Sequence, residues 1–465
     1  MARASLLRWL KGSNRSRQTP VRRRAPMGVE PLEDRSMPST FTVTTPLDVV
    51  SATDGKMSLR EAVTAANAHA GADTIVLPAG VFKITIPGAI ENGNATGDFD
   101  VTQDLTIKGA GSSATVIDAQ KLDRLFDLLG NIGVTFSGVT LQHGNAGAFD
   151  GGAIQALSAN ITLDHCVVKD NAAGLGGGGI NDLAGNVTLI GTTVARNVAQ
   201  NDGGGIHVGT GALVVKGASS VRRNWSHGNG GGIFAGGGLT MTNSTASGNV
   251  ASADGGGIKA TTATLTGSTV SRNAISGNGG GISATTANLT NSTVADNATL
   301  ASGGGIVASG GTLLNCTIAE NSAGTGGGVA HTGAGAFTVR NTIIALNFTD
   351  FAGTNPDVSG AFTSGGHNLI GDGTGSTGFT NLSNGDMVGT GASPIDPKLG
   401  PLANNGGTTK TMALLAGSPA IDHGDSTATN PVTNKPLTSD QRGLPRVKDG
   451  NGDGRAVADI GAFER

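Results

Sequence analysis

The sequence predicts a right-handed parallel β-helix, an all-β solenoid in which successive coils of the chain stack on one another. Two recurring markers and the composition predict it. A Gly-Gly-[Gly/Ala]-[Ile/Val] marker recurs at a nearly constant spacing, and an Asn precedes its last residue by nine positions in seven units and by eight in the eighth. Gly makes up 78 of 465 residues, well above the usual level of about 7%, and accompanies many Ser, Thr, Asn and Val. Short strands joined by tight turns have this composition. The first marker ends at Ile154, Ile180, Ile206, Ile233, Ile258, Ile282, Ile306 and Val329, and the Asn positions are Asn145, Asn171, Asn197, Asn224, Asn249, Asn273, Asn297, Asn321 and Asn347.

The period of the markers, about 24 residues, selects among the repeat architectures. It fits one coil of three short strands and three turns, stacked on its neighbours. Leucine-rich repeats share the period but require a dense leucine framework, which this chain lacks. The Gly residues follow no every-third-residue pattern with Pro, which excludes collagen.

Three columns of side chains are expected to fill the interior of the solenoid, because stacked coils place equivalent residues about 4.8 Å apart. One column is apolar and lies eight residues before the Asn, with Lys216 as an exception. A second, three residues before the Asn, holds Val, Ile or Ala. The third, five residues before it, holds small residues. The members of the third column are Cys166, Thr192, Ser219, Ser244, Ser268, Ser292, Cys316 and Thr342.

The turns and the cysteines follow from the same stacking. The Asn column suits a turn that tolerates left-handed backbone geometry and lets stacked amides bond along the axis. The Gly run suits a corner that needs a positive φ. Cys166 and Cys316 share a column six coils apart, or about 29 Å, so they cannot form a disulfide and are expected to be free and buried.

Residues 1–39 form a basic leader that we interpret as an export or targeting segment. Residues 1–35 carry nine Lys or Arg and three acids, so the leader is +6 and the rest of the chain −9, which together give the formal net charge of −3. A nucleic-acid-binding arm is the less favoured alternative. The segment at 29–39, V-E-P-L-E-D-R-S-M-P-S, resembles an atypical export segment that precedes large secreted β proteins. The leader therefore implies a secreted or cell-surface protein. No run of 18 apolar residues exists, so no membrane span is expected.

Residues 40–138 are expected to cap the solenoid and to form its first coils. The segment Met57-Ser58-Leu59-Arg60-Glu61-Ala62 has the spacing of a helix capping box, and Leu59, Ala62, Val63 and Ala66 share one helical face. It resembles the N-terminal domain named for its C-S-L-R-E-A motif, with Met in place of Cys. Such a helix would close the open apolar end of the solenoid. Arg60 and Asn67 are interpreted as cap residues rather than catalysts.

Two further resemblances concern the remaining chain. The repeats of residues 139–349 are similar to those of polymorphic outer membrane proteins, which implies a pectin-lyase-like β-helix of the adhesin type. Residues 350–465 resemble the choice-of-anchor Q domain, which implies a β-rich C-terminal region with export and surface association. The five segments that carry this second resemblance are G-H-N-L-I-G at 366–371, I-D-P-K-L-G-P-L at 395–402, G-S-P-A-I-D at 417–422, D-Q-R-G at 440–443 and D-I-G-A-F-E at 459–464.

A loop near the C-terminus has the spacing of a calcium site. Residues 449–454 read D-x-N-x-D-G, which places the oxygen donors Asp449, Asn451 and Asp453 at every second position before a Gly. The Glu expected at position 12 is replaced by Ile460, and Asp459 beside it can complete a non-standard site. A structural Ca²⁺ is therefore predicted here. The alternative is an acidic turn closed by backbone hydrogen bonds.

The column directly before the Asn should face solvent, where the chemistry of a β-helix would lie. Asp296 and Glu320 occupy adjacent coils at about the 5 Å spacing of a retaining glycosidase pair. Arg196 and Arg223 are similar to the arginine bases of pectate-lyase-like proteins. The competing and favoured interpretation is an alternation of charge that keeps the ladder soluble.

The function expected from the sequence is a non-enzymatic, secreted or cell-surface β-solenoid for adhesion, envelope structure or glycan binding. Its partners would be polysaccharides or cell-envelope components rather than nucleic acid. Trp225 and Phe234 can stack on a sugar ring or simply cover an exposed coil. The alternative is a polysaccharide lyase or glycoside hydrolase that uses Asp296 and Glu320 or Arg196 and Arg223.

Overall fold

The computed structural model describes residues 37–88, 91–349, 356–430 and 434–465. The predicted export segment falls almost wholly outside these ranges. Residues 38–465 form one compact unit. Within the described ranges, no helix is both long and apolar enough to cross a bilayer.

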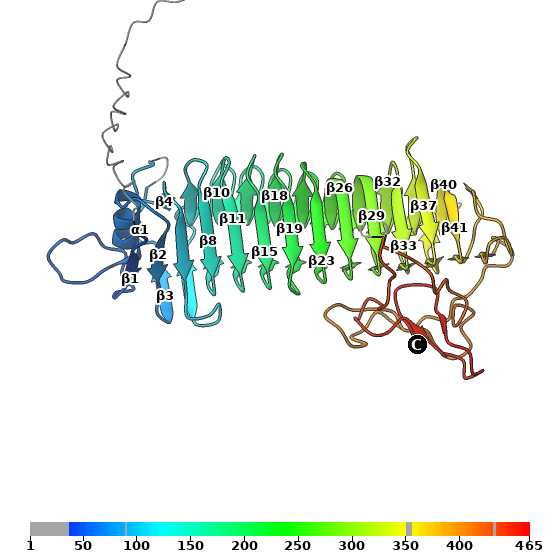
Figure 1. The fold of residues 1–465 in the computed structure, drawn as a ribbon. Coiled ribbons are helices and arrows are strands. Elements are labelled where there is room, and N and C mark those ends of the chain that lie inside the picture. The colour runs from blue at the N-terminus through cyan, green and yellow to red at the C-terminus, as the bar shows by residue number, and fades with distance from the viewer. Residues whose placement is uncertain (1–36, 89–90, 350–355, 431–433) are drawn as a thin grey trace, which may run out of the picture. The chain divides into compact units, whose positions relative to one another are not determined.

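The unit is a parallel β-solenoid of about ten turns with a single described helix, so the predicted fold class is confirmed (Figure 1). Each strand pairs in parallel with the equivalent strand of the next coil, and the pairings build three long sheets. The pairing Ile154↔Ile180↔Ile206 shows that the first marker stacks in register, as its spacing predicts.

Sheet 1 has 23 strands in two parallel rows. One row consists of β4 (Phe99–Val101), β7 (Phe126–Leu128), β10 (Ile154–Ala156), β14 (Ile180–Asp182), β18 (Ile206–Val208), β22 (Ile233–Ala235), β32 (Ile306–Ala308), β36 (Val329–His331), β40 (Val358–Ala361) and β43 (Ser376–Thr377). The other row consists of β1 (Thr40–Thr42), β2 (Asp73–Val76), β5 (Leu105–Lys108), β8 (Gly133–Ser137), β11 (Asn160–Asp164), β15 (Val187–Ile190), β19 (Leu213–Lys216), β23 (Leu239–Thr242), β33 (Gly311–Leu314), β37 (Phe337–Arg340) and β41 (Thr363–Gly366). The long strands β26 (Ile258–Thr266) and β29 (Ile282–Thr290) belong to both rows.

Sheets 2 and 3 form the other walls of the solenoid. Sheet 2 contains β3 (Gly80–Lys83), β6 (Thr115–Asp118), β9 (Thr140–Gln142), β12 (Val167–Lys169), β16 (Thr193–Ala195), β20 (Ser220–Arg222), β24 (Thr245–Ser247), β27 (Thr269–Ser271), β30 (Thr293–Ala295), β34 (Thr317–Ala319), β38 (Ile343–Ala345), β42 (Leu369–Ile370) and β44 (Met387–Val388). Sheet 3 contains β13 (Ala172–Ala173), β17 (Val198–Ala199), β21 (Trp225–Ser226), β25 (Val250–Ala251), β28 (Ala274–Ile275), β31 (Ala298–Thr299), β35 (Ser322–Ala323) and β39 (Phe348–Thr349).

Most coils have four short strands rather than the predicted three. The wall formed by sheet 1 is interrupted in these coils, as at residues 183–186 (L-A-G-N) between β14 and β15. β26 and β29 carry A-T-T-A at the same place and run through without a break. Gly weakens a strand interior whereas Thr favours it, which explains the difference.

The predicted inward columns are buried. The third-column residues are at most 1% exposed. Hydroxyl oxygens of this column accept from the backbone of the preceding coil, as Thr192 does from Cys166 N–H at 3.2 Å. The exception predicted at Lys216 was wrong. Val215 stacks between Leu189 and Met241 with 0% exposure, and Lys216 points outward. The turn after Val215 contains one additional residue, so the inward apolar residue of this coil lies one position further from its Asn than in the other coils.

The Asn column forms a continuous amide ladder from Asn171 to Asn347, as predicted. The prediction was wrong for Asn145, which is exposed: Gly144 N–H donates to Asn171 Oδ1 in its place, at 2.7 Å. Asn197 Nδ2 donates to Asn224 Oδ1 at 3.0 Å, and the Asn197 backbone N–H donates to the same oxygen at 3.0 Å. The left-handed backbone, however, lies one residue earlier than predicted, at positions such as Arg196 (φ 55°) and Arg223 (φ 54°). The Asn side chain must point inward to form hydrogen bonds along the axis. The residue before it therefore adopts the left-handed conformation that turns the chain. The first Gly of the other marker has a positive φ, as at Gly203 (φ 69°).

Cys166 and Cys316 are both free and buried, which confirms the prediction. Burial raises the pKa of the Cys166 thiol to about 11 and that of Cys316 to about 12.

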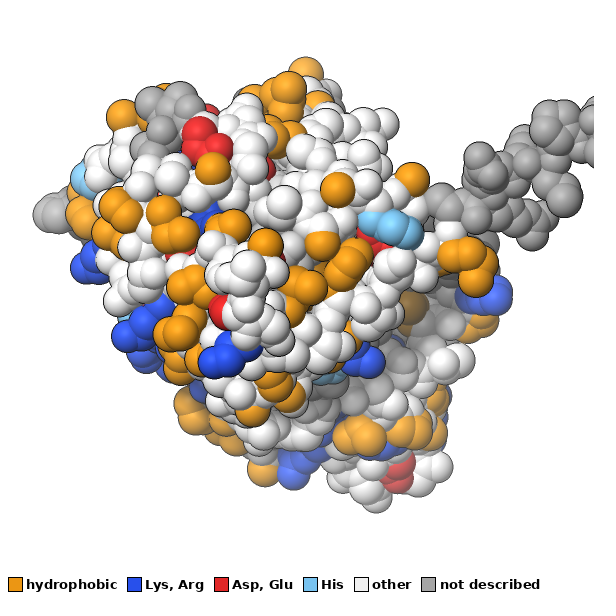
Figure 2. Space-filling model, turned by 90° about the vertical axis from the view of Figure 1, so that its left-hand side faces the viewer, with side chains coloured by type: hydrophobic (Ala, Val, Ile, Leu, Met, Phe, Trp, Pro, Cys, Tyr) orange, Lys and Arg blue, Asp and Glu red, His pale blue; other side chains and the backbone are white. Residues whose placement is uncertain are grey.

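Helix α1 (Leu59–Ala68) covers the N-terminal end of the solenoid. Its capping box is present: Glu61 N–H donates to Ser58 Oγ at 3.1 Å, and Ser58 N–H donates to the Glu61 carboxylate at 2.8 Å. The predicted apolar face is buried against the first coils. Figure 2, which looks onto this end, shows hydrophobic side chains in scattered small groups rather than an open core. The helix therefore shields the apolar interior, as repeat proteins require.

The C-terminal residues pack beside the solenoid wall (Figure 1). The parallel ladder continues beyond residue 349, through β44. Thereafter the chain is mostly irregular and has one short antiparallel pair, β45 (Val447–Lys448) with β46 (Val457–Ala458), so it is less rich in strands than predicted. Gln441 fastens it to the wall: its Nε2 donates to Thr269 Oγ1 at 3.0 Å and its Oε1 accepts from Thr293 Oγ1 at 2.6 Å.

Candidate functional site

A single outward column of side chains runs along sheet 1, and we call it the groove column. Its members directly follow the buried Ile or Val of the first marker, or its equivalent in the earlier coils, so strand alternation turns them away from the core. The register places them side by side on successive coils. The groove column comprises Asp100, Asp127, Gln155, Asn181, His207, Phe234, Lys259, Ser283 and Val307.

The middle of the groove column is a chain of contacts. Asn181 Nδ2 donates to Gln155 Oε1 at 2.9 Å, and Asn181 Oδ1 lies 2.7 Å from His207 Nδ1. The His207 ring stacks on Phe234 with centroids 4.9 Å apart and an interplanar angle of 18°. Burial lowers the pKa of His207, which favours a neutral ring at pH 7. His207 and Phe234 thus form a flat, uncharged aromatic surface, which the hydrogen bond between His207 and Asn181 holds in place on one side.

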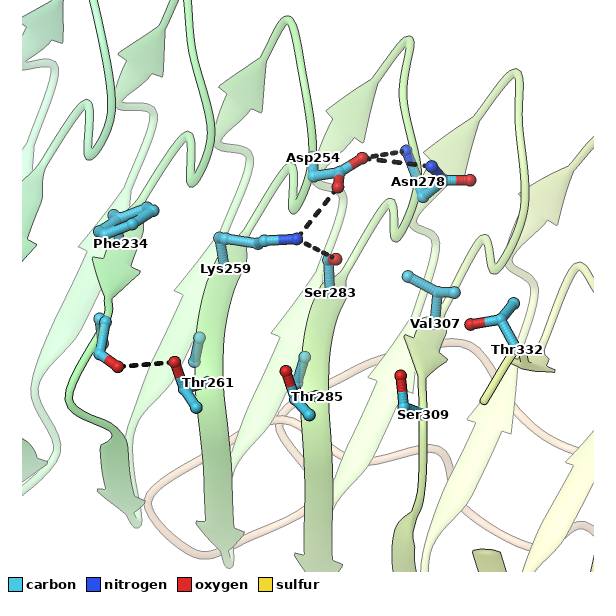
Figure 3. Close-up of a pocket in the computed structure, with 14 residues that line it drawn as sticks. Phe234, Asp254, Lys259, Thr261, Asn278, Ser283, Thr285, Val307, Ser309 and Thr332 are labelled. Carbon is cyan, nitrogen blue, oxygen red and sulfur yellow. Dashed lines mark hydrogen bonds and ion pairs between the residues drawn. The ribbon is translucent and has the colours of Figure 1, made fainter. Parts of the chain in front are cut away.

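Beyond Phe234, the column opens into a groove of about 390 Å³ (Figure 3). Lys259 Nζ donates to Asp254 Oδ2 and to Ser283 Oγ, each at 3.0 Å. Burial raises the pKa of Asp254, but hydrogen bonds from Asn278 and Lys259 outweigh it and leave the pKa below its ordinary value. Thr261, Thr285, Ser309 and Thr332 add hydroxyls along the rest of the groove, as Figure 3 shows. The groove thus combines an aromatic ring, one fixed ion pair and a row of hydroxyl groups.

The column singled out from the sequence, directly before the Asn, is exposed or half-exposed as predicted. Arg196 forms a two-point ion pair with Asp170 on the preceding coil, with both N···O distances 2.7 Å. Arg223 lines a separate cleft with Arg222, Arg272 and Lys410. Arg196 and Glu320 lie five coils apart, or about 24 Å. The four candidate catalytic residues therefore spread along the axis and do not converge on one cleft.

Asp296 and Glu320 do come together. Their side chains share a hydrogen bond, and Arg272 approaches Asp296 from the other side with an N···O distance of 3.2 Å. Burial and the hydrogen bond to Asp296 raise the pKa of Glu320. Hydrogen-bonded carboxyls lie closer than the about 5 Å of a retaining pair, which leaves less room for a sugar between them. The catalytic interpretation of this pair stays a prediction.

The predicted calcium loop is closed by its own backbone. Asp449 accepts hydrogen bonds from Gly452 N–H at 2.6 Å and from Gly454 N–H at 2.8 Å, and the latter helps to lower its pKa. Asp459 is buried, and its two oxygens accept from Asp422 N–H and Arg465 N–H. Asn451 and Asp453 are exposed. A Ca²⁺ bound by these four residues stays a prediction.

A different acidic group, absent from the sequence predictions, lies at the N-terminal end of the groove column. Asp98, Asp100 and Asp127 each place a carboxylate oxygen within 4.8 Å of the others, the one such group among the described residues. Burial raises the pKa of Asp98 to about 8, helped by the nearby Asp123, and raises that of Asp100 to about 6. Buried carboxylates so close together repel one another, so the group can hold a metal ion.

No family model matches the chain, and no curated protein matches it. Among solved structures, the chain is similar to pectate lyase Pel9A, with 15% identity, coverage of 92% of this chain and 97% of that chain, and a TM-score of 0.44. This likeness concerns the fold.

Both missed sites leave a signal in the sequence. From Gln155 onward, every groove-column residue follows the marker Ile by one position, and alternation alone turns it outward. Asp98 directly precedes β4 and Asp100 lies within it, and Asp127 follows Asp100 at the interval of one coil. The sequence prediction missed them because the first marker becomes recognisable only at Ile154, after these coils.

Proposed function

We propose that this chain is a non-enzymatic β-solenoid of the cell exterior that binds extended glycan chains along its groove column. The observation that carries the proposal is the His207–Phe234 stack beside the groove of Lys259, Asp254 and Ser283. Sugar rings present apolar faces and hydroxyl edges. An aromatic surface next to fixed polar groups provides both kinds of contact, as small-molecule binding sites commonly do.

The shape of the site fits a linear polymer. The groove spans the coils from β22 to the residues after β36, or about 19 Å along the axis, and a hydroxyl side chain recurs on the four coils after β22, at Thr261, Thr285, Ser309 and Thr332. Towards the N-terminus, half-exposed Phe149 stands over a second hollow that reaches Gln155. A chain of sugars can therefore meet similar contacts at successive coils.

Binding is favoured over cleavage because the groove lacks a catalytic pair. Asp254 is the single carboxylate among the described residues that line it, and Lys259 holds it in an ion pair. Most glycoside hydrolases use two carboxyl groups that flank the scissile bond. A groove with one neutralised carboxylate can hold a glycan without cleaving it.

The test measures the retention of the purified chain on neutral and acidic polysaccharides by affinity electrophoresis. Phe234→Ala should weaken binding at least tenfold, a loss of about 1.4 kcal/mol. Trp225→Ala is the matched control, because Trp225 is an exposed aromatic residue of sheet 3, outside the groove, whose ring centroid lies 4.4 Å from that of His227. Equal retention of the Phe234→Ala variant and the unmodified chain would contradict the proposal, as would a loss confined to Trp225→Ala.

The second candidate function is a polysaccharide lyase or glycoside hydrolase. One observation favours it: Glu320 lies beside Asp296, and burial together with this neighbouring carboxyl group raises the pKa of Glu320, the direction that a general acid requires. Following chain cleavage in the same polysaccharide samples tests it. Cleavage that disappears in Glu320→Gln or Asp296→Asn would replace the binding proposal with an enzymatic one.

We propose Ca²⁺ as a structural ion of this chain. Two sets of oxygen donors support it, the exposed loop at 449–454 and the group of Asp98, Asp100 and Asp127. Oxygen donors of this kind suit a hard cation. Equilibrium dialysis of the full chain against Ca²⁺ at pH 7 tests the proposal, and a chain that binds none at millimolar concentrations would contradict it.

A further inference from the structure

The acidic group of Asp98, Asp100 and Asp127 lies where the N-terminal cap meets the first coils. Helix α1 holds β4 and the residues before it. Arg60 donates to the Gly97 carbonyl at 2.7 Å and to the Asp98 carbonyl at 3.2 Å, and Asn67 Nδ2 donates to the Asp100 carbonyl at 2.7 Å. The cap thus fixes two of the three acids, whereas the third belongs to the next coil, on β7.

Asp98 and Asp127 of this group line a pocket whose charge is not balanced by its own residues. Its volume is about 300 Å³, and Glu91 and Asp123 line it together with Asp98 and Asp127. Arg124 is the single cation among the described lining residues. Its Nη1 lies 3.0 Å from Asp127 and its Nε 3.6 Å from Asp98, and that Nε atom is buried without a hydrogen-bond partner. One guanidinium therefore faces several carboxylates, of which it hydrogen-bonds Asp127 and approaches Asp98 only to 3.6 Å.

A buried oxygen of the group lacks a partner. Asp100 is 0% exposed. Its Oδ2 accepts from Asn94 N–H at 2.7 Å, whereas its Oδ1 has no hydrogen-bond partner in the structure. Buried polar atoms are nearly always satisfied, so an orphan carboxylate oxygen next to two further carboxylates points to a missing cationic ligand.

We propose that Asp98, Asp100 and Asp127 bind one hard divalent cation, Ca²⁺, which joins the N-terminal cap to the first coils of the solenoid. This inference rests on the structural Ca²⁺ proposed above and specifies which residues bind that ion. Oxygens within 4.8 Å of one another can surround one ion at Ca–O distances of about 2.3–2.6 Å after small side-chain movements. The pocket leaves space for water to complete the six to eight ligands that Ca²⁺ prefers.

The competing account makes Arg124 the permanent counter-ion. Under that account the pocket needs no metal, and the removal of the guanidinium destabilises the protein without creating affinity for Ca²⁺. Under the proposal, Arg124 competes with the ion for Asp98 and Asp127. Arg124→Gln should therefore raise the affinity for Ca²⁺ severalfold, and Ca²⁺ should restore the thermal stability of this variant.

The experiment titrates Ca²⁺ into the full chain by calorimetry after treatment with a chelator. Asp127→Asn changes the most accessible ligand and should weaken the site at least tenfold while far-UV circular dichroism stays unchanged. The matched control is the double variant Asp449→Asn/Asp453→Asn, which removes two acids from the exposed loop and should leave this site intact. Ca²⁺ should also raise the melting temperature and slow amide exchange in α1, in the unmodified chain and in the loop variant but not in Asp127→Asn.

Each other outcome overturns the inference in a distinguishable way. Ca²⁺ binding that is lost only in the loop variant, or that persists unchanged in Asp127→Asn, places the ion elsewhere and leaves the proposed cofactor standing. If the chain binds no Ca²⁺ at all, both this inference and the proposed structural Ca²⁺ are wrong. If Asp127→Asn does not fold, Arg124→Gln decides, because only a metal site predicts tighter Ca²⁺ binding in that variant.

Discussion

Asn347 donates both its backbone N–H and its side-chain Nδ2 to Oδ1 of Asp357, at 3.0 and 2.8 Å. Asp357 thereby takes the place that an Asn fills in each coil from Asn171 to Asn347, and its carboxyl group is the last acceptor of the amide ladder. Its other oxygen accepts from Asp372 N–H at 2.7 Å. The ladder is therefore closed at its C-terminal end by a buried carboxylate rather than by solvent.

An interior rung of the ladder should contribute strongly to stability. Asn249 accepts from the backbone and side chain of Asn224 and donates to Asn273 and to the Val221 carbonyl. Asn249→Ala leaves several of these buried groups without partners and should lower the free energy of unfolding by about 2–5 kcal/mol. Urea denaturation measures it. Asn288→Ala, on the outer face of β29, is the control and should cost under about 0.5 kcal/mol; similar losses in both variants would contradict the structural role of the ladder.

Asp357 should make stability depend on pH. Burial raises its pKa to about 6 in the folded protein, above its ordinary value of 3.8. The folded state then holds the proton more tightly, so the stabilisation is complete below pH 3.8 and is lost as the pH rises to about 6. Asp357→Asn keeps a neutral acceptor for Asn347 and should remove this part of the pH dependence, at a constant cost from the lost bond to Asp372. Denaturation of both proteins at pH 4 and pH 7 tests it, and parallel pH profiles would contradict the assignment.

Arg60 should be irreplaceable in the cap. Its guanidinium is 0% exposed, binds Asp48 at two points (2.7 and 3.2 Å) and lies over the Phe99 ring at 4.9 Å. Lysine cannot form the two-point bond or reach the same carbonyls. Arg60→Lys should therefore cost about 3–5 kcal/mol and raise amide exchange throughout α1. Lys83→Met, on the exposed side of β3, serves as the control, and a protected α1 in Arg60→Lys would refute the prediction.

The two thiols should react only after unfolding. Both cysteines are buried, and their raised pKa values keep them protonated at pH 8. Ellman's reagent should detect no thiol in the native chain and two in denaturant. Cys316→Thr should cost about 1 kcal/mol or less, because Thr fills the same column at Thr342 and accepts the backbone bond of the preceding coil. Rapid native labelling would show that this column opens to solvent.

Much of the fold could be predicted because the repeat aligns equivalent residues without any knowledge of the coordinates. The buried columns, the amide ladder, the free cysteines and the capping box at Ser58 and Glu61 all depend on spacing along the chain. Counting positions back from the Asn gave the wrong inward residue where a coil contains one additional residue. Val215, rather than Lys216, fills the apolar column, because the pairing of strands and not the distance from the Asn decides which side chain faces inward.

The candidate sites were less predictable because their members belong to different coils. His207 and Phe234 are separated by a full coil of chain, and only the parallel register brings their ring centroids to 4.9 Å. Asp98 and Asp127 lie in coils without a recognisable marker, so no sequence column aligns them. Conversely, the motif at 449–454 predicts an ion site from spacing alone, and the structure adds that Asp449 accepts hydrogen bonds from the backbone of the same loop.

By itself, the sequence determined that this protein is a solenoid, which side chains fill it, and that its N-terminal end is closed by a helix. These properties follow from the periodic recurrence of buried positions, which can be recognised in the sequence. Only the tertiary structure decided which outward side chains meet, that a groove forms beside Phe234, and that carboxylate oxygens of Asp98, Asp100 and Asp127 lie within 4.8 Å of one another. Contacts between coils depend on the exact register across a whole coil of intervening chain, and a single inserted residue changes which side chains become neighbours.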